Sequence, residues 1–277
     1  MRGLAKIGAI AAAILVLAGL LVTGIGKWRE SAHRARCQFH LSRVGLFALW
    51  NVTDPAIPIP KDDAERSKFT RIPDQMQPDP NKYFPAGTVA NAAIPPTERL
   101  SVFPVLLPYL QQGVVERMDL NQGWNADANH EPATTLIPYL VCPSQFRRHE
   151  GSNMAPTHFL GMAGLGSDAP KLMQSNPRAG MFRYDDATRV GALQRGLSYS
   201  VSFVEASTSI GPWIAGGPAT VRGVDSEQKL FGRRAQFGGN HPNGCNVAYA
   251  DGSVRFAAND MTHRVFGLLA TLAEQTE

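Results

Sequence analysis

The sequence contains few cysteines and few charged side chains. Three cysteines in 277 residues are too few for a disulfide-rich scaffold. Charged residues make up 18% of the chain and hydrophobic residues 44%. This balance excludes wholesale disorder, because disordered chains combine low hydrophobicity with high charge. Internal repeats and low-complexity tracts are also absent, and the length suffices to bury a core, so we expect a folded body.

Most of the chain also lacks an excess of positive charge. Residues 1–50 contain seven basic side chains and one acidic side chain, which gives this segment a formal charge of +6. Residues 51–277 contain 20 basic and 22 acidic residues, so their formal charge is −2. Because a nucleic-acid-binding domain carries its basic residues on the folded part, we do not expect nucleic acid as a partner.

One long uncharged run lies near the N-terminus. Residues 7–25 form 19 consecutive positions without charge, ten of them Ile, Leu or Val. As a helix this run would be about 28 Å long, close to the thickness of a membrane's hydrocarbon core. Lys6 and Lys27 flank the run, and Trp28 follows where an interfacial aromatic is expected. We therefore predict a retained single-pass anchor in the lipid bilayer. The alternative is a cleaved signal peptide, whose apolar part would be shorter.

Helical periodicity continues beyond the predicted anchor. Apolar residues recur at helical spacing as far as about residue 50, and Asp54-Pro55 then ends the pattern. These residues are Ala32, Ala35, Phe39, Leu46 and Trp50, with Leu41, Val44 and Ala48 widening the stripe. We therefore divide the chain into residues 1–50, an anchor with a continuing helix, and residues 51–277, a globular domain.

Most of the globular part is interpreted as short strands joined by loops. Nine of the 20 prolines fall within residues 51–98, which predicts an irregular stretch. Glycine-bounded apolar segments at 159–166, 180–184, 197–205 and 211–217 have the rhythm of strands.

The C-terminal region contains two clearer elements. Two apolar runs within residues 245–256 flank Asp251-Gly252, a strong signal for a hairpin with positive φ at both turn positions. Residues 260–277 are compatible with a helix. Its predicted apolar face consists of Val265, Leu268, Leu269 and Leu272.

Several short motifs occur in order along the chain. Residues 237–244 read Phe-Gly-Gly-Asn-His-Pro-Asn-Gly, and nine residues separate His241 from Asp251-Gly252. This arrangement resembles the His-x9-Asp-Gly signature of a large bacterial family of prepilin-like proteins built on a domain of unknown function. Further similar blocks are residues 37–41, 106–111, Cys142-Pro143-Ser144, 157–161, and 196–198 with Glu205.

The resemblance implies a pilin-like α+β fold. In that fold a long N-terminal helix, apolar at its start, packs on an antiparallel β-sheet domain with long loops. The helix start would lie in the inner membrane and the domain outside the cytoplasm, with the bilayer and other pilin-like subunits as partners. Family members usually carry a glutamate early in the helix, but Gly8 stands at that position here and Lys6 precedes it. We therefore favour a simple membrane-anchored derivative and leave both N-terminal processing and filament assembly open.

The residues with chemical potential support two interpretations. His241 and Asp251 lie across the predicted hairpin and could form an acid–base or metal pair, with Glu205 and His263 nearby. The sequence contains no helix-borne His-Glu-x-x-His motif and no clustered metal-ligand spacing. We therefore favour a structural role: His241 braces the hairpin and Asp251-Gly252 shapes its turn. We predict no catalytic residue, metal or cofactor.

The cysteines leave two alternatives open. Cys37 and Cys142 both fall in blocks that resemble the family, and outside the cytoplasm they could form a disulfide between helix and domain. They could equally be two buried free thiols. Cys245 would then be an unpaired thiol. Taken together, the sequence favours a non-enzymatic envelope protein that acts as a structural or interaction module. The alternatives are a tethered metal-dependent hydrolase and an extracytoplasmic module that binds a ligand or glycan.

Overall fold

The structure of the chain is a computed structural model that describes residues 2–54, 77–110, 113–145 and 153–273. Its first element is the single helix α1 (Arg2–Trp50), 49 residues long, which confirms the helix predicted to about residue 50. Side chains cap its C-terminal end. Asn51 Nδ2 donates to the Phe47 carbonyl at 2.7 Å, and Thr53 Oγ1 donates to the Trp50 carbonyl at 3.1 Å. These bonds satisfy carbonyl groups that the helix end would otherwise leave without partners.

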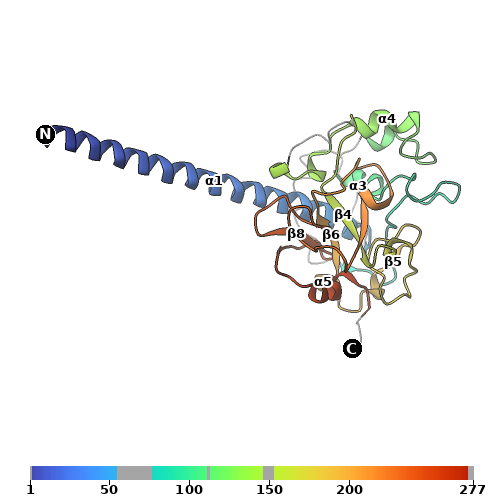
Figure 1. Ribbon diagram of the computed structural model, residues 1–277. Coiled ribbons are helices and arrows are strands. Elements are labelled where there is room, and N and C mark those ends of the chain that lie inside the picture. Colours follow the sequence, from blue (N-terminus) through green and yellow to red (C-terminus); the bar gives the residue numbers. More distant parts are fainter. Residues whose placement is uncertain (1, 55–76, 111–112, 146–152, 274–277) are drawn as a thin grey trace.

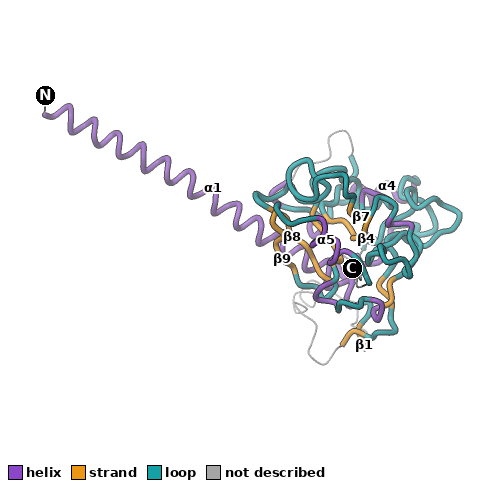
Figure 2. The backbone as a smooth tube through the Cα atoms, turned by 60° about the horizontal axis from the view of Figure 1, so that its bottom comes forward, coloured by secondary structure: helices purple, strands orange, loops and turns teal. Residues whose placement is uncertain are grey.

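The two halves of α1 lie in different surroundings. The N-terminal half extends away from the body, and the C-terminal half lies within it (Figures 1 and 2). Large apolar side chains on the extended half are exposed, including Leu21 at 64% and Trp28 at 81%. From Arg43 to Trp50, by contrast, every residue is buried.

The predicted apolar stripe of this helix is partly wrong. Ala32 and Ala35 are exposed, and Phe39 is 47% exposed. Burial begins at Cys37, where the body first covers the helix. Beyond Arg43 the body covers the helix on all sides, so a one-sided stripe does not describe the buried segment.

Within the described residues, no helix contains a stretch that is both long and apolar enough to cross a membrane. The side chains of residues 2–13, 16–18, 20 and 22 are outside the described part. Most of the anchor predicted for residues 7–25 falls among them.

The central sheet has five strands in the order β7-β4-β6-β8-β9. Its strands are β4 (Phe159–Leu165), β6 (Val201–Glu205), β7 (Val221–Val224), β8 (Gly244–Tyr249) and β9 (Val254–Ala258). Neighbours pair antiparallel except β7, which is parallel to β4. The sheet is therefore mixed, not antiparallel as expected. Residues 206–220 cause the difference, because they carry the chain from β6 past β4 to the sheet edge.

Alternation along the strands divides the core into two layers. Phe159 and Ala163 of β4 join the layer that contains the C-terminal half of α1 and helix α3 (Phe103–Leu110). Leu160 and Met162, the alternate residues of β4, join the layer on the other face with helix α5 (His263–Ala270). Successive side chains of a strand point to opposite faces, so the sheet is covered by apolar residues on both sides.

The remaining elements are short. Strand β1 (Thr53–Asp54) pairs with β2 (Gln77–Pro78). Strand β3 (Tyr83–Phe84) pairs with β5 (Thr188–Arg189). Helix α4 (Asp127–Thr134) lies at the periphery. Residues 55–76, in the middle of the predicted irregular stretch, are outside the described part.

Two of the four predicted glycine-bounded strands are present. β4 and β6 fall within residues 159–166 and 197–205, whereas residues 180–184 and 211–217 form no strand. Within residues 211–217 the backbone makes only isolated bridges, Pro212 with Pro156 and Ala215 with Leu100. Pro212 has no N–H group to donate to a ladder, which explains why this segment does not extend into a strand.

The C-terminal hairpin is confirmed, but its turn differs from the prediction. The Gly252 N–H bonds to the Tyr249 carbonyl at 2.9 Å, and the Tyr249 N–H bonds to the Ser253 carbonyl at 2.9 Å. Gly252 has a φ of +79°, whereas Asp251 is not among the residues with positive φ. This is a longer loop closed by a left-handed glycine, in place of the two-residue turn. Asp251 Oδ1 accepts a hydrogen bond from the Ser253 N–H at 2.9 Å, and this bond stabilises the loop.

The C-terminal helix is present, but its buried face is only partly the predicted one: Leu269 packs against the core and Leu272, just beyond the helix, is 3% exposed. In α5 the buried residues are Phe266, Gly267 and Ala270, while Val265 is 48% exposed. The Phe266 ring lies 4.9 Å from that of Phe231, edge-on. Burying this aromatic ring removes more apolar area from water than burying Val265, so it sets the orientation of the helix.

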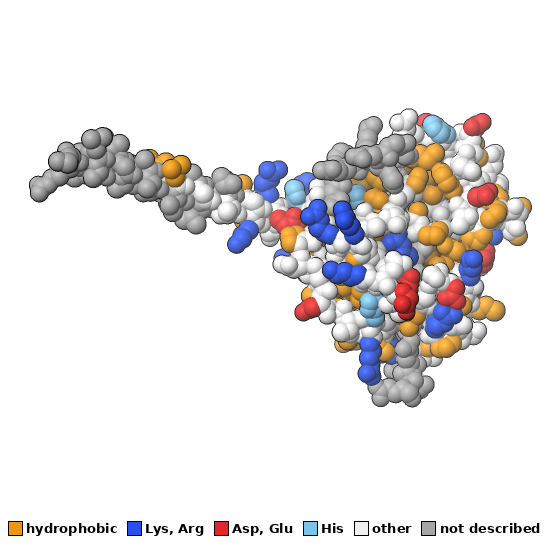
Figure 3. Space-filling view, viewed as in Figure 1, with side chains coloured by type: hydrophobic (Ala, Val, Ile, Leu, Met, Phe, Trp, Pro, Cys, Tyr) orange, Lys and Arg blue, Asp and Glu red, His pale blue; other side chains and the backbone are white. Residues whose placement is uncertain are grey.

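Basic side chains surround the point where α1 enters the body (Figure 3). Four exposed residues on this part of the helix are basic: Lys27, Arg29, Arg34 and Arg36. The excess positive charge of the N-terminal segment is therefore concentrated at the junction between the extended helix and the body.

Candidate functional site

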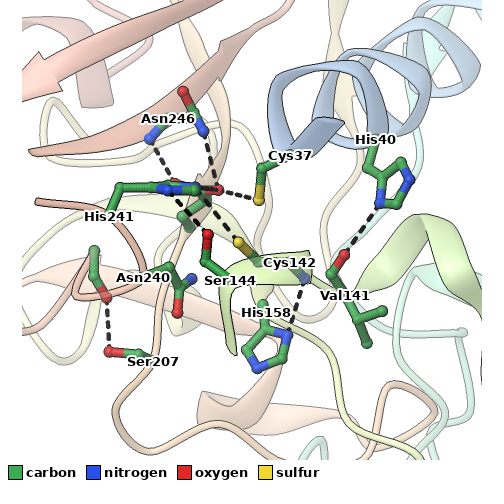
Figure 4. Close-up of polar contacts among 12 residues, drawn as sticks. Cys37, His40, Val141, Cys142, Ser144, His158, Ser207, Asn240, His241 and Asn246 are labelled. Carbon is green, nitrogen blue, oxygen red and sulfur yellow. Dashed lines mark hydrogen bonds and ion pairs between the residues drawn. The ribbon is translucent and has the colours of Figure 1, made fainter. Parts of the chain in front are cut away.

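Four residues that the sequence singled out meet in one buried cluster, and Figure 4 labels three of them, Cys37, Cys142 and His241. Their ligand-type atoms all lie within 4.8 Å of one another. We call this group the four-residue cluster; its members are Cys37, Cys142, Glu205 and His241. Cys37, Cys142 and Glu205 have no solvent exposure, and His241 is 5% exposed. The cluster is therefore a polar site inside the protein.

Each member comes from a different segment of the fold. Cys37 lies on α1 where that helix enters the body, and Glu205 is the last residue of β6. Cys142 precedes the short turn Pro143–Gln145. His241 lies in the loop before β8, which the left-handed residues Gly238 and Gly239 fold back. The Gly238 N–H bonds to the Glu205 carbonyl at 2.7 Å, which holds this loop against the end of β6.

The Glu205 carboxylate has several hydrogen-bond donors around it. Oε2 accepts the backbone N–H of Asn246 at 2.7 Å, and Oε1 accepts from Asn246 Nδ2 at 3.1 Å. The Cys37 thiol donates to Oε1 at 2.5 Å. His241 Nε2 lies 3.4 Å from the same oxygen. A buried carboxylate requires such partners, because burying an unpaired charge is very unfavourable.

The two ring nitrogens of His241 face different groups. Nε2 points into the cluster and lies 3.4 Å from Cys142 Sγ. Nδ1 lies 2.6 Å from Glu30 Oε1 and 3.4 Å from Ser144 Oγ. Glu30 is the single acidic residue of the N-terminal 50 and lies about two turns before Cys37, where burial of α1 begins. A carboxylate on Nδ1 favours a proton on that nitrogen, so Nε2 is the nitrogen that a metal ion would bind after displacing the Nε2 proton.

A further histidine positions Cys142. The Cys142 N–H donates to His158 Nδ1 at 3.1 Å. Burial lowers the pKa of His158 to about 4, so its ring is neutral and can accept this bond. His158 thus fixes the backbone from which the Cys142 thiol enters the cluster.

Burial and the neighbouring polar groups both shift the pKa values of the cluster residues. Burial raises the pKa of Cys37, and the neighbouring Cys142 and Glu205 raise it further. Burial also raises the pKa of Cys142, but hydrogen bonds from Cys37 and His241 outweigh it and lower the value to about 7. For His241, burial lowers the pKa, while Cys142 and Glu205 outweigh burial and raise it to about 11. In the described arrangement His241 is therefore the cation that compensates the buried carboxylate.

The other predicted site residues lie elsewhere. Asp251 and Gly252 form the tip of the hairpin, whereas His241 precedes β8 at its opposite end. The expected approach of His241 to Asp251 is therefore wrong, because the whole length of β8 separates them. His263 lies outside the cluster at the start of α5, and its Nε2 lies 2.8 Å from the Gln228 carbonyl. Of the possible acid–base set, the structure brings together only His241 and Glu205.

All three cysteines are free and buried. Cys37 and Cys142 share the four-residue cluster, so the disulfide between them stays a prediction. Cys245 is fully buried outside the cluster, and burial raises its pKa well above the usual range. It is a core thiol of the α5 layer.

Sequence reasoning missed several residues around the cluster, namely Glu30, Ser144, His158 and Asn246. Ser144 and His158 belong to blocks of the family resemblance, and Glu30 stands out as an isolated acid in a basic segment. These residues come from segments that are far apart in the chain, and they meet His241 only in the folded structure. No local sequence spacing therefore connects them with it. A ligand search based on short sequence spacing could not find such a site.

A family model described as "protein of unknown function (DUF1559)" matches residues 79–223, slightly more than half of the chain. His241 and the Asp251-Gly252 pair lie beyond the matched residues. No curated protein and no solved structure matches the chain.

Proposed function

The chain belongs to the DUF1559 family of proteins of unknown function, and from that premise we propose that it is a non-enzymatic, membrane-anchored, pilin-like envelope protein. In this proposal the start of α1 lies in the inner membrane and holds one folded body outside the cytoplasm. The body acts as a structural or interaction module, with the bilayer and pilin-like subunits as partners.

The observation that carries the proposal is the exposed apolar surface of the extended half of α1. Ile14, Leu15 and Leu21 are 59%, 73% and 64% exposed. Large apolar side chains exposed to this extent favour a partner that removes them from water. A lipid bilayer fits, because the run without charge has the length of a membrane's hydrocarbon core.

The basic junction supports the same arrangement. Exposed Lys27 and Arg29 follow the uncharged run directly, and Trp28 between them is 81% exposed. Basic residues and tryptophan are the side chains that favour the headgroup region. In this position they would hold the body close to the lipid surface.

Alkaline extraction of membranes tests the anchor. We expect the full chain to stay in the membrane pellet and the double variant Ile14→Lys/Leu21→Lys to move to the soluble fraction. Two lysines near the middle of a span oppose insertion by roughly 5–7 kcal/mol. Leu120→Lys/Met173→Lys is the matched control, because it adds the same charge at positions of the body that are 42% and 73% exposed. A full chain that washes off the membrane, or equal partition of both double variants, would contradict the proposal.

A further inference from the structure

We propose that the four-residue cluster binds one zinc ion, which fastens α1 to the sheet. The ligands are Cys37 Sγ, Cys142 Sγ, His241 Nε2 and Glu205 Oε1. This inference goes beyond the proposed function and is independent of it, because the cluster would bind zinc whether or not α1 enters a bilayer.

The positions of the ligand atoms suit a small tetrahedral ion. With zinc–ligand bonds of about 2.0–2.3 Å, the edges of a tetrahedral site are about 3.3–3.8 Å long. His241 Nε2 lies 3.4 Å from both Cys142 Sγ and Glu205 Oε1. Cys37 Sγ lies 2.5 Å from Glu205 Oε1 as a hydrogen-bond donor, and this contact lengthens by about 1 Å when zinc replaces the thiol proton. All four atoms already lie within 4.8 Å of one another.

The chemistry of the donors points to zinc among the common metals. Two thiolates exclude calcium and magnesium, which prefer oxygen ligands. Thiolate, imidazole and carboxylate are all ligands that zinc accepts, and structural zinc sites hold four protein ligands in tetrahedral geometry. Four protein ligands also leave no open position for a water or a substrate. The inferred ion is therefore structural, in agreement with a non-enzymatic protein.

The surroundings supply the second layer that zinc ligands require. A ligating histidine usually donates its other ring N–H to a carboxylate, and His241 Nδ1 lies 2.6 Å from Glu30 Oε1. The Glu205 carboxylate is likewise oriented by the backbone and side chain of Asn246. These contacts hold the His241 ring with Nε2 toward the cluster and fix the orientation of Glu205.

A cleft lies beside the cluster. It has a volume of about 370 Å³ and lies between α1 and the loop before β8. Glu30, Arg34 and Asn243 are among its lining residues. Glu30 contacts His241 directly, so one residue separates the cleft from the nearest ligand of the cluster.

The ligands connect parts of the fold that are distant in the sequence. Cys37 comes from α1, and Cys142 comes from the segment between α4 and β4. Glu205 ends strand β6, and His241 lies in the loop before β8. A single ion would thus hold the emerging helix in a fixed direction relative to the body.

Metal analysis of the full chain, purified in detergent with its thiols reduced, tests the assignment. We expect one zinc ion per chain after dialysis against metal-free buffer. Substitution with Co²⁺ should produce a thiolate-to-cobalt charge-transfer band and the intense visible absorption of a tetrahedral site. The cobalt spectrum needs no substitution in the chain, so it tests the site even if a ligand variant fails to fold.

Variants identify the ligands. Cys142→Ser and His241→Ala should lose the retained ion, whereas Cys245→Ala and His40→Gln should keep it. Cys245 is a buried thiol outside the cluster, and His40 lies one turn beyond Cys37 on α1. Glu30→Gln removes only the outer carboxylate, so it should keep one ion per chain with affinity roughly 10–100-fold weaker.

Three outcomes would overturn the proposal. The first is a reduced full chain that neither retains nor takes up zinc, or that retains a different metal which zinc does not displace. The second is equal retention of zinc by Cys142→Ser and Cys245→Ala. The third is a Cys37–Cys142 disulfide in the chain as isolated from the envelope, found as a cross-linked peptide, with no zinc bound.

Discussion

Glu205 illustrates how the site depends on single residues. Its carboxylate has no solvent exposure, and its partners come from Cys37, Asn246 and His241. The sequence singled out Glu205 because it belongs to one of the blocks that resemble the prepilin-like family. It gave no indication that Glu205 would meet two thiols. That meeting depends on where β6 ends relative to α1, and no local pattern encodes this distance.

Gly252 is a residue whose role the sequence predicts more completely. Its φ of +79° is the left-handed conformation that the Asp-Gly pair indicates. A Cβ atom at this position would lie 2.6 Å from Leu46 Cδ2 on α1, so Gly252 also permits close packing of the hairpin tip against the helix. Only the tertiary structure reveals this second requirement.

We predict that Gly252→Ala lowers the free energy of unfolding by more than the left-handed strain of about 1–2 kcal/mol. Gly113→Ala is the matched control: its φ is +88°, but a Cβ atom there meets nothing within 4 Å. That control should lose the strain energy alone. Denaturant unfolding of the full chain in detergent measures both, and equal losses would contradict the role of Gly252 against Leu46.

At the scale of elements, α1 combines two kinds of helix in one continuous segment. Its extended half exposes apolar side chains, whereas every residue from Arg43 to Trp50 is buried. Periodicity predicted the length of the helix correctly but not its buried surface. A hydrophobic stripe describes a helix covered on one side, and the end of α1 is covered on all sides.

This difference predicts unequal effects of the same substitution along α1. Phe47→Ala should lower the free energy of unfolding by about 3–5 kcal/mol, because Phe47 is 1% exposed and packs edge-on against Trp50 at 4.7 Å. Phe39→Ala should cost about 1 kcal/mol or less, since that ring is 47% exposed and its main partner is the Arg43 guanidinium at 5.0 Å. Similar losses in both variants would mean that α1 packs differently.

The C-terminal elements show where pattern recognition works and where it fails. The β8–β9 hairpin follows from two apolar runs around Asp251-Gly252, because turn chemistry and alternation are local properties. The position of α5 was also predicted, but its buried face was predicted only in part, because Phe266 and not Val265 is buried. The face depends on the rings of Phe231 and Phe237, which lie 4.9 and 6.0 Å from Phe266 and belong to another part of the chain.

At the scale of the whole molecule, the chain consists of a body with a long helix extending from it. The sequence predicts the helix, the α+β composition and the concentration of basic residues in the N-terminal segment. It does not predict the parallel pairing of β7 with β4, or the four-residue cluster at the base of the helix. Both result from long connections that bring distant segments together, and neither leaves a periodic signal.

The two ends of α1 have different roles in this proposal. In our account the apolar start holds the chain in the lipid, and the buried end, with its zinc site, fixes the direction in which the body is held. Exposed Lys27, Arg29, Arg34 and Arg36 lie between these two regions. They would therefore be the first sites that trypsin reaches from outside the membrane.

Limited trypsin digestion of spheroplasts that contain the full chain tests the central claim most directly. The account predicts release of a folded fragment whose N-terminus lies between residues 28 and 37, while a short N-terminal peptide stays with the membrane. N-terminal sequencing and mass measurement of both products give this result. A full-length chain that remains intact until the spheroplasts are lysed, or a mature chain that begins after residue 25 and is already soluble before digestion, would contradict the account.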